Sequence, residues 1–182
     1  MIARWPGGLL AFVAALASAP SLAGPESARY VAAPRLPDSF DRLKAPLPAP
    51  FDPAANAAAQ LAEARARARR ENKLLLLELG ANWCGYCRNL AGTMALPSMR
   101  AFVQRHFVEL PVDVGRFDRN LEIAGRYDVD PLPGVPVVLI VDPVSDRVLN
   151  EGQVSLFVHL KRPGPQGIAN WLAQWVRPAS GG

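Results

Sequence analysis

The chain has 182 residues, 50% of them apolar, which excludes a disordered chain and predicts a globular domain with a packed core. Its 20 basic and 16 acidic residues give a formal net charge of +4. Apart from one run at residues 64–70, which alternates with alanine like the polar face of a helix, the basic residues are scattered. The charge therefore predicts a solvated helix face, and no nucleic-acid partner is expected.

The first 23 residues have the pattern of a cleavable export signal. Arg4 precedes an apolar stretch at residues 7–19, and the small residues Ser21 and Ala23 suit cleavage after residue 23. The apolar stretch is short for a transmembrane helix, which needs about 20 residues. We therefore expect a periplasmic protein without stable membrane insertion after cleavage; a retained anchor is the alternative.

The rest of the chain divides into three parts by composition. Residues 24–52 form a leader in which proline is frequent, so neither a helix nor a central strand is expected there, and the leader is extended along the domain or disordered. The folded domain is expected at residues 53–177, and residues 178–182 form a flexible tail. Asp52 is the expected N-cap of the first helix, with Pro53 in its first turn.

Hydrophobic patterning within the domain alternates between helical spacing and strand-like apolar runs. The segments expected to be helical are 54–72, 85–94, a stretch from Pro97, 120–127 and 167–176. The expected strands are 73–80, 106–114, 135–142 and 147–151. This order predicts an α/β fold with a central mixed sheet of about four strands flanked by helices, the last two strands being antiparallel.

Both cysteines lie in the sequence WCGYC, where the first strand runs into the next helix. Unpaired N–H groups and the helix dipole favour a thiolate at a helix N-terminus, so Cys84 is the expected nucleophile. Cys87 lies one helical turn further on and can attack a mixed disulfide on Cys84 to release the partner. The bridge closes a very small loop, which makes it a poor structural staple.

A metal site is the alternative use of a cysteine pair. A four-coordinate zinc site needs further ligands, and the chain has no third cysteine. His106 and His159, its two histidines, are expected to be ordinary surface or strand-edge residues. We therefore expect no metal and no organic cofactor, and a copper carrier that uses the CxxC pair stays as an alternative.

WCGYC after an apolar strand, with GVPVVLIVD roughly 50 residues later, resembles the thioredoxin fold over residues 54–176. The spacing is most similar to that of exported thioredoxin-like proteins and of the C-terminal thioredoxin-like domain of the membrane reductase DsbD. The resemblance implies a thiol–disulfide oxidoreductase that exchanges disulfides with protein clients and with an upstream redox partner.

The resemblance also implies roles for individual residues. In such proteins the first cysteine attacks and the second resolves, which matches Cys84 and Cys87. The tryptophan before the pair, here Trp83, flanks the active site. Pro136 matches a proline that is cis and lies against the disulfide, and the residue before it, Val135, pairs its backbone with the client.

Glu78 stands six residues before Cys84, where thioredoxins carry a buried acid, usually aspartate. Burial would raise the pKa of this carboxyl and suit it to take a proton from Cys87. Gly85 and Tyr86 between the cysteines resemble the dipeptide of periplasmic disulfide isomerases, and Tyr86 is expected to make contacts at the rim. The Trp-Cys start and the acid point toward reductants instead.

These features predict a periplasmic, monomeric thiol–disulfide oxidoreductase that is more a reductant than an oxidant. The alternative from another class is a redox-inert module that holds clients in the groove around Trp83, Val135 and Pro136. Catalytic turnover separates the two. The sequence does not set the direction of electron flow, because a reduction potential depends on the relative stability of the two redox forms.

Overall fold

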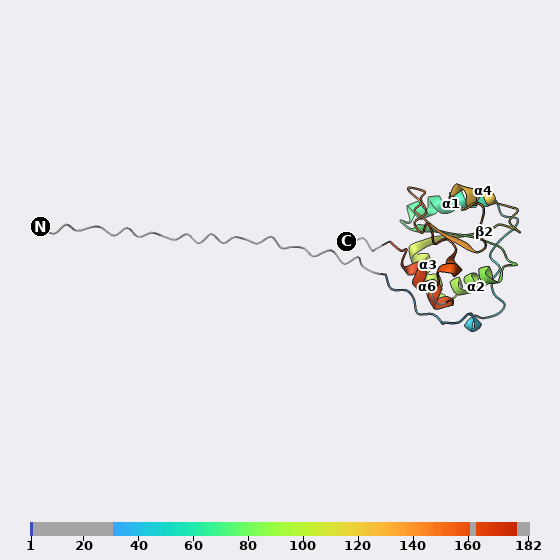
Figure 1. Ribbon diagram of the computed structural model, residues 1–182, viewed down its shortest axis with the longest axis horizontal. Helices are drawn as coiled ribbons and strands as arrows, with labels where there is room; N and C mark the ends of the chain where they lie inside the picture. The colour runs from blue at the N-terminus through green and yellow to red at the C-terminus, as the bar shows by residue number, and fades with distance from the viewer. Residues whose placement is uncertain (2–30, 161–162, 178–182) are drawn as a thin grey trace.

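The structure is a computed structural model that describes Met1, residues 31–160 and residues 163–177 (Figure 1). The predicted export signal at residues 1–23 and the predicted tail at 178–182 lie outside this range, apart from Met1. Within the described residues, no helix combines the length and the apolar character needed to cross a membrane.

A central sheet of three strands runs in the order β2-β1-β3. β1 (Leu74–Gly80) pairs in parallel with β2 (Phe107–Asp113) and antiparallel with β3 (Val137–Val141). Every residue of β1 is buried, as expected for an apolar central strand covered on both faces. The predicted α/β fold with a mixed sheet is therefore confirmed.

Helices cover both faces of this sheet (Figure 1). One face packs against α1 (Ala57–Arg70) and α4 (Leu121–Arg126), and the other against α2 (Gly85–Met94), α3 (Pro97–His106) and α6 (Pro165–Ala173). The short elements are the 3-10 turn η1 (Phe40–Arg42) and α5 (Leu156–His159). Because side chains alternate along a strand, successive residues of β1 enter the two hydrophobic cores in turn.

α1 begins later than predicted, because Asn56 is the N-cap in place of Asp52. The Asn56 side-chain oxygen accepts a hydrogen bond from the N–H of Ala59 at 3.0 Å. The Asp52 carboxylate instead accepts from the N–H of Ala54 at 2.9 Å, within a turn that precedes the helix. Asparagine and aspartate are equally good N-caps, so residue preference alone does not separate the two positions.

Most of the basic run lies on the exposed side of α1, as predicted, but Arg65 is largely covered and pairs with Asp146 at 2.9 Å. Ala64 and Ala68 are buried against the sheet, whereas Arg67 forms a surface ion pair with Glu71 at 2.7 Å. This pairing is the expected behaviour of a solvated helix face.

The predicted fourth strand at residues 147–151 is wrong: the segment makes a single isolated bridge, between Val148 and Val141. Beyond this bridge, the Asn150 side chain makes the hydrogen bonds to β3 that the backbone of a fourth strand would otherwise make. Its oxygen accepts from the N–H of Ile140 at 2.8 Å, and its amide donates to the carbonyl of Val138 at 2.8 Å. Asn150 is fully buried, so the chain is held against β3 by a side chain and does not continue the ladder.

The proline-rich leader is packed on the domain from residue 31 onward and passes along α6 and α2 in Figure 1. Gln166 of α6 clasps it, accepting from the N–H of Leu36 at 2.7 Å and donating to the carbonyl of Pro34 at 3.1 Å. Further along, the Arg88 guanidinium of α2 donates to the carbonyl of Leu47 at 2.7 Å. With these contacts the leader runs along the domain and ends beside the cysteine pair.

Candidate active site

Cys84 and Cys87 form a disulfide at the N-terminus of α2. Cys84 is the N-cap residue, and its sulfur accepts a hydrogen bond from the N–H of Cys87 at 3.1 Å. Cys84 keeps 5% of its surface exposed, whereas Cys87 is fully buried. In the reduced protein the same N–H group and the helix dipole would stabilise a thiolate on Cys84, the sulfur that a client can reach.

Val135 and Pro136 lie beside the disulfide, in the loop that leads into β3. The peptide bond between them is cis. The carbonyl oxygen of Val135 is 3.5 Å from the sulfur of Cys84, and Val135 packs against the cluster that holds both cysteines. The structure therefore brings these two residues to the pair, although they lie about 50 positions away in the sequence.

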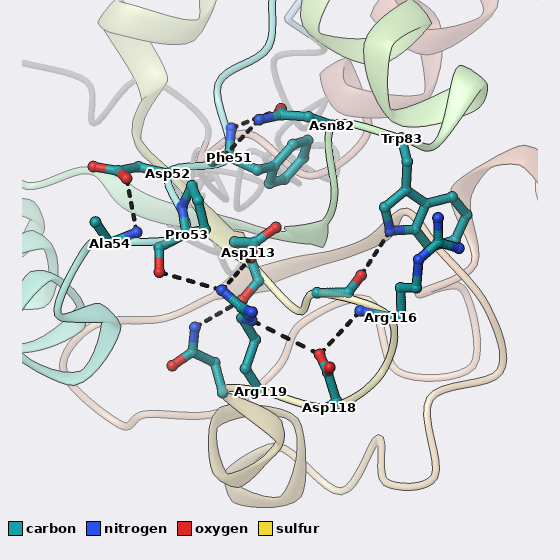
Figure 2. Close-up of polar contacts among 12 residues, drawn as sticks. Phe51, Asp52, Pro53, Ala54, Asn82, Trp83, Asp113, Arg116, Asp118 and Arg119 are labelled. Atoms are coloured by element: carbon teal, nitrogen blue, oxygen red, sulfur yellow. Dashed lines mark hydrogen bonds and ion pairs between the residues drawn. The ribbon is translucent and has the colours of Figure 1, made fainter.

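Trp83 directly precedes Cys84 and is half exposed; Figure 2 shows its side chain above the loop after β2. Its indole N–H donates to the carbonyl of Gly115 at 2.7 Å, which fixes the ring over the loop after β2. Phe117 meets the indole edge-on, with ring centroids 6.2 Å apart, and the Arg116 guanidinium lies 5.4 Å from its centroid. The result is an exposed aromatic and cationic surface beside Cys84.

Gly85 and Tyr86 are exposed at the start of α2. A side chain at Gly85 would meet no other atom within 4 Å, so this position is open to an approaching molecule. The ring of Tyr86 lies 4.9 Å from that of Phe157 in α5. Between them and Val135 opens a small cavity of about 190 Å³ that also reaches Pro136.

Phe51 is the site residue that sequence reasoning missed. Its ring is buried against both cysteines, and its backbone is held by Asn82 through hydrogen bonds of 3.1 Å and 2.7 Å (Figure 2). The β1 residue Gly80 makes room for it, because a Cβ at that position would lie 2.5 Å from the ring. In the sequence, Phe51 stands out only as an aromatic residue among the prolines of the leader.

Glu78 is buried in β1 on the Cys87 side of the sheet. Gly80 points to the same face, and a Cβ there would lie 3.2 Å from the sulfur of Cys87. Burial raises the pKa of the Glu78 carboxyl well above its usual range, and the neighbouring Glu109 carboxyl raises it further. Among the described residues, its Oε1 atom has no hydrogen-bond partner.

Replacing Glu78 with glutamine should weaken the dependence of stability on pH. Because the pKa of this carboxyl is raised in the folded state, the folded protein binds the proton more tightly than the unfolded chain does. The free energy of unfolding should therefore fall as pH rises from about 4.5, the ordinary glutamate value, through the raised pKa.

Denaturant unfolding of the oxidised protein between pH 4 and 9 measures this slope, since the disulfide-bonded cysteines do not titrate. Glu78→Gln should show a smaller loss of stability with pH than the wild-type protein does. The matched control is Glu122→Gln on α4, at an exposed position on the opposite face of the sheet. Equal slopes in Glu78→Gln and the wild type would contradict the prediction.

Neither histidine adjoins the cysteine pair in the sequence. His106 ends α3 and contacts Phe102, and His159 ends the short helix α5. Over the described ranges, no three His, Cys, Asp or Glu side chains gather in a way that would hold a metal ion.

Comparison with known proteins agrees with this geometry. A family model described as thioredoxin-like matches residues 56–143. The crystal structure of a disulphide isomerase from Xylella fastidiosa Temecula1 is 34% identical, with a TM-score of 0.60, and the match covers 70% of this chain and 97% of that one. No curated protein matches.

The chain therefore belongs to the thioredoxin-like family. Its fold and its Cys84–Cys87 pair make it a thiol:disulfide oxidoreductase.

Proposed function

We propose that this protein is an exported enzyme that reduces disulfides in protein clients. The observation that carries the proposal is the cysteine pair at the N-terminus of α2. The Val135 carbonyl lies beside the sulfur of Cys84, which is the more accessible of the two, and the buried acid Glu78 lies on the Cys87 side of the sheet. The pair itself carries the electrons, so the reaction needs no metal or organic cofactor.

The reaction begins with the reduced enzyme, in which the Cys84 thiolate attacks a client disulfide. A Cys84–client bond forms, the client bond breaks, and one client sulfur leaves as a thiolate. Cys87 then gives its proton to Glu78 and attacks the Cys84 sulfur. The Cys84–Cys87 disulfide forms, the second client sulfur leaves, and two electrons have passed to the client. An upstream redox partner reduces the pair again.

Client binding would use the surface around the accessible sulfur. The client backbone pairs with Val135, beside Pro136, and Trp83 borders the site. The cavity next to Tyr86 accepts a client side chain, because it is lined partly by apolar residues and opens beside the pair. Such a surface recognises an extended, unfolded segment and not one folded partner.

The export signal expected at residues 1–23 supports a periplasmic location, and the protein would act there as a monomer. The Trp-Cys start and Glu78 favour the reductive direction, as in the exported thioredoxin-like proteins and the DsbD domain that the sequence resembles. Isomerisation of wrong disulfides is a second candidate, favoured by the similarity to the solved disulphide isomerase and by the Gly85-Tyr86 dipeptide.

The reduction potential of the pair, measured in defined thiol buffers, tests the proposal. Trp83 adjoins Cys84 and makes tryptophan fluorescence a suitable readout. A value near about −270 mV would place the protein with reductants, whereas one near about −180 mV would favour the isomerase and one near about −120 mV an oxidant. If the pair does not cycle, the protein is a client-binding module and the proposed enzyme is wrong.

A further inference from the structure

The leader contains a short helical turn, η1, whose first residue is Phe40. Ser39 caps this turn, because its hydroxyl accepts a hydrogen bond from the N–H of Asp41 at 3.2 Å. The N–H of Leu43 closes the turn on the carbonyl of Phe40 at 2.9 Å. The ring of Phe40 is partly buried and packs against the hydrophobic core that α2, α3 and α6 share. The turn therefore directs one aromatic side chain of the leader onto the domain.

Phe40 is the first of three aromatic rings that lead from the leader to the cysteine pair. The ring centroids of Phe40 and Phe157 are 6.0 Å apart, and those of Phe157 and Tyr86 are 4.9 Å apart. Both distances lie in the range over which tilted aromatic rings attract each other. Tyr86 stands between the two cysteines in the sequence. A single intermediate ring, that of Phe157, thus connects the leader to the active site.

Phe157 needs support from outside its own helix. α5 has four residues, too few to be stable alone, and within the described part of the chain no side chain caps its N-terminus. Leu156 anchors the helix, since it is fully buried, but Phe157 is only partly buried and Val158 is exposed. Contacts with Tyr86 and with Phe40 therefore hold the ring of Phe157 in place.

The ring of Phe157 forms one wall of the cavity of about 190 Å³ beside the cysteine pair. Tyr86, Val135 and Pro136 line the same cavity, so aromatic and apolar groups form much of its wall. Because the Val135 carbonyl is 3.5 Å from the sulfur of Cys84, a client side chain in the cavity would lie next to the client cysteine. Such walls favour a large apolar side chain, for example leucine.

The leader is held on both sides of η1, which fixes the position of Phe40. Before the turn it lies against the start of α6, where the N–H of Gln166 donates to the carbonyl of Pro37 at 3.0 Å. Gly164 lies so close to the carbonyl group of Asp38 that a Cβ at this position would collide with it. After the turn, the guanidinium contact from α2 described above holds the leader again.

We propose that Phe40 is a positioning residue for client binding, which holds Phe157, and through it Tyr86, against the cavity that accepts an apolar client side chain. The leader is then part of the client site. This inference rests on the proposed function, because it concerns how clients of the same cysteine pair are recognised. Phe40 does not line the cavity and acts through Phe157.

Two symmetric peptide disulfides test this role in the full chain. They are identical except that leucine flanks each cysteine in one and glycine in the other, so only the leucine peptide fills the cavity. Turnover is measured with dithiothreitol as electron source, after subtraction of the uncatalysed rate. Phe40→Ala should lower kcat/KM for the leucine peptide roughly tenfold, as the loss of about one methylene contact in an apolar pocket does.

The kinetic constants separate positioning from damage to the chemistry. The loss in Phe40→Ala should appear as a higher KM at unchanged kcat, because the lost contact is equal in the ground state and the transition state. The kcat/KM of the glycine peptide should stay unchanged, since this peptide leaves the cavity empty. Phe40→Tyr keeps the ring and should retain the wild-type preference for leucine.

Two further variants separate this role from a general loosening of the leader. Leu47→Ala removes a leader side chain that packs at Gly92 of α2 and belongs to neither ring pair, so it should leave both peptides unaffected. Gly164→Ala should reproduce the effect of Phe40→Ala, because its Cβ displaces Asp38 and with it the turn that carries Phe40. The backbone of Gly164 is extended, so alanine adopts it without strain.

The NMR signals of the Tyr86 ring protons give a readout that does not depend on turnover. The ring current of Phe157 shifts these signals, because the two centroids are 4.9 Å apart. In the oxidised protein, Phe40→Ala should move the Tyr86 signals toward those of an isolated tyrosine. Leu47→Ala should leave them in place.

An unchanged leucine-to-glycine ratio of kcat/KM in Phe40→Ala would overturn the inference, and so would an equal loss in Leu47→Ala. Failure of the proposed function would look different, because the wild-type protein would then reduce neither peptide. In that case, binding of the leucine peptide with serine in place of cysteine tests the positioning role. Phe40→Ala should weaken this binding, and equal binding by the wild type and the variant would overturn the role.

Discussion

Serine in place of Cys84 should reduce insulin-reduction activity to the background rate of the thiol buffer. The serine hydroxyl does not ionise near neutral pH, so the N–H of Cys87 and the helix dipole have no thiolate to stabilise. Activity is measured from the turbidity of the reduced insulin chains. Unchanged activity would contradict the assignment of Cys84 as nucleophile.

Serine in place of Cys87 is the matched control, because it removes the other half of the same disulfide. Cys84 can still attack, but the mixed disulfide is no longer resolved from within the protein. Cys87→Ser should therefore accumulate a covalent complex with its clients, visible on a non-reducing gel, and Cys84→Ser should not. The reverse pattern would exchange the roles of the two cysteines.

Alanine in place of Phe51 should destabilise the protein by about 3–5 kcal/mol, as is usual when a buried phenylalanine is truncated. The ring fills the space between Gly80 and the disulfide, and its loss leaves a cavity beside Cys87. Urea unfolding of the oxidised protein measures the change in free energy. In the reduced protein, water entering this cavity should make Cys87 react faster with iodoacetamide.

Phe117→Ala is the control for this prediction. Phe117 lies at the same end of the molecule but is 43% exposed, so its removal should change the free energy of unfolding by far less. If the two variants were equally stable and Cys87 stayed equally unreactive in both, Phe51 would not be the residue that closes the site.

The centre of the site could be predicted from sequence because its signals are local. A buried strand followed by Cys84 and Cys87 at a helix start fixes the position of the pair within a few residues. Pro136 lies far along the chain, yet it comes directly before an apolar strand that pairs with β1, so the resemblance was enough to place it.

The parts that escaped prediction depend on contacts between distant segments. Phe51 reaches the disulfide because Asn82 holds its backbone, a pairing of residues 31 positions apart that no periodicity reveals.

The wrong fourth strand has the same kind of cause. The pattern of residues 147–151 suits a strand, but the buried Asn150 side chain competes for the backbone groups of β3. Local side-chain-to-backbone bonds of this sort are an alternative to a ladder, and strand propensity does not anticipate them.

The same asparagine affects how the sheet meets other polypeptides. Along β3, the N–H and carbonyl of Ile140 are bonded to Asn150 and Leu149, and those of Val138 to Val154 and Asn150. Exposed strand edges are templates for pairing with foreign strands. The outward N–H and carbonyl groups of Val138 and Ile140 are already bonded within the protein, so we expect this edge of the sheet to resist edge-to-edge aggregation.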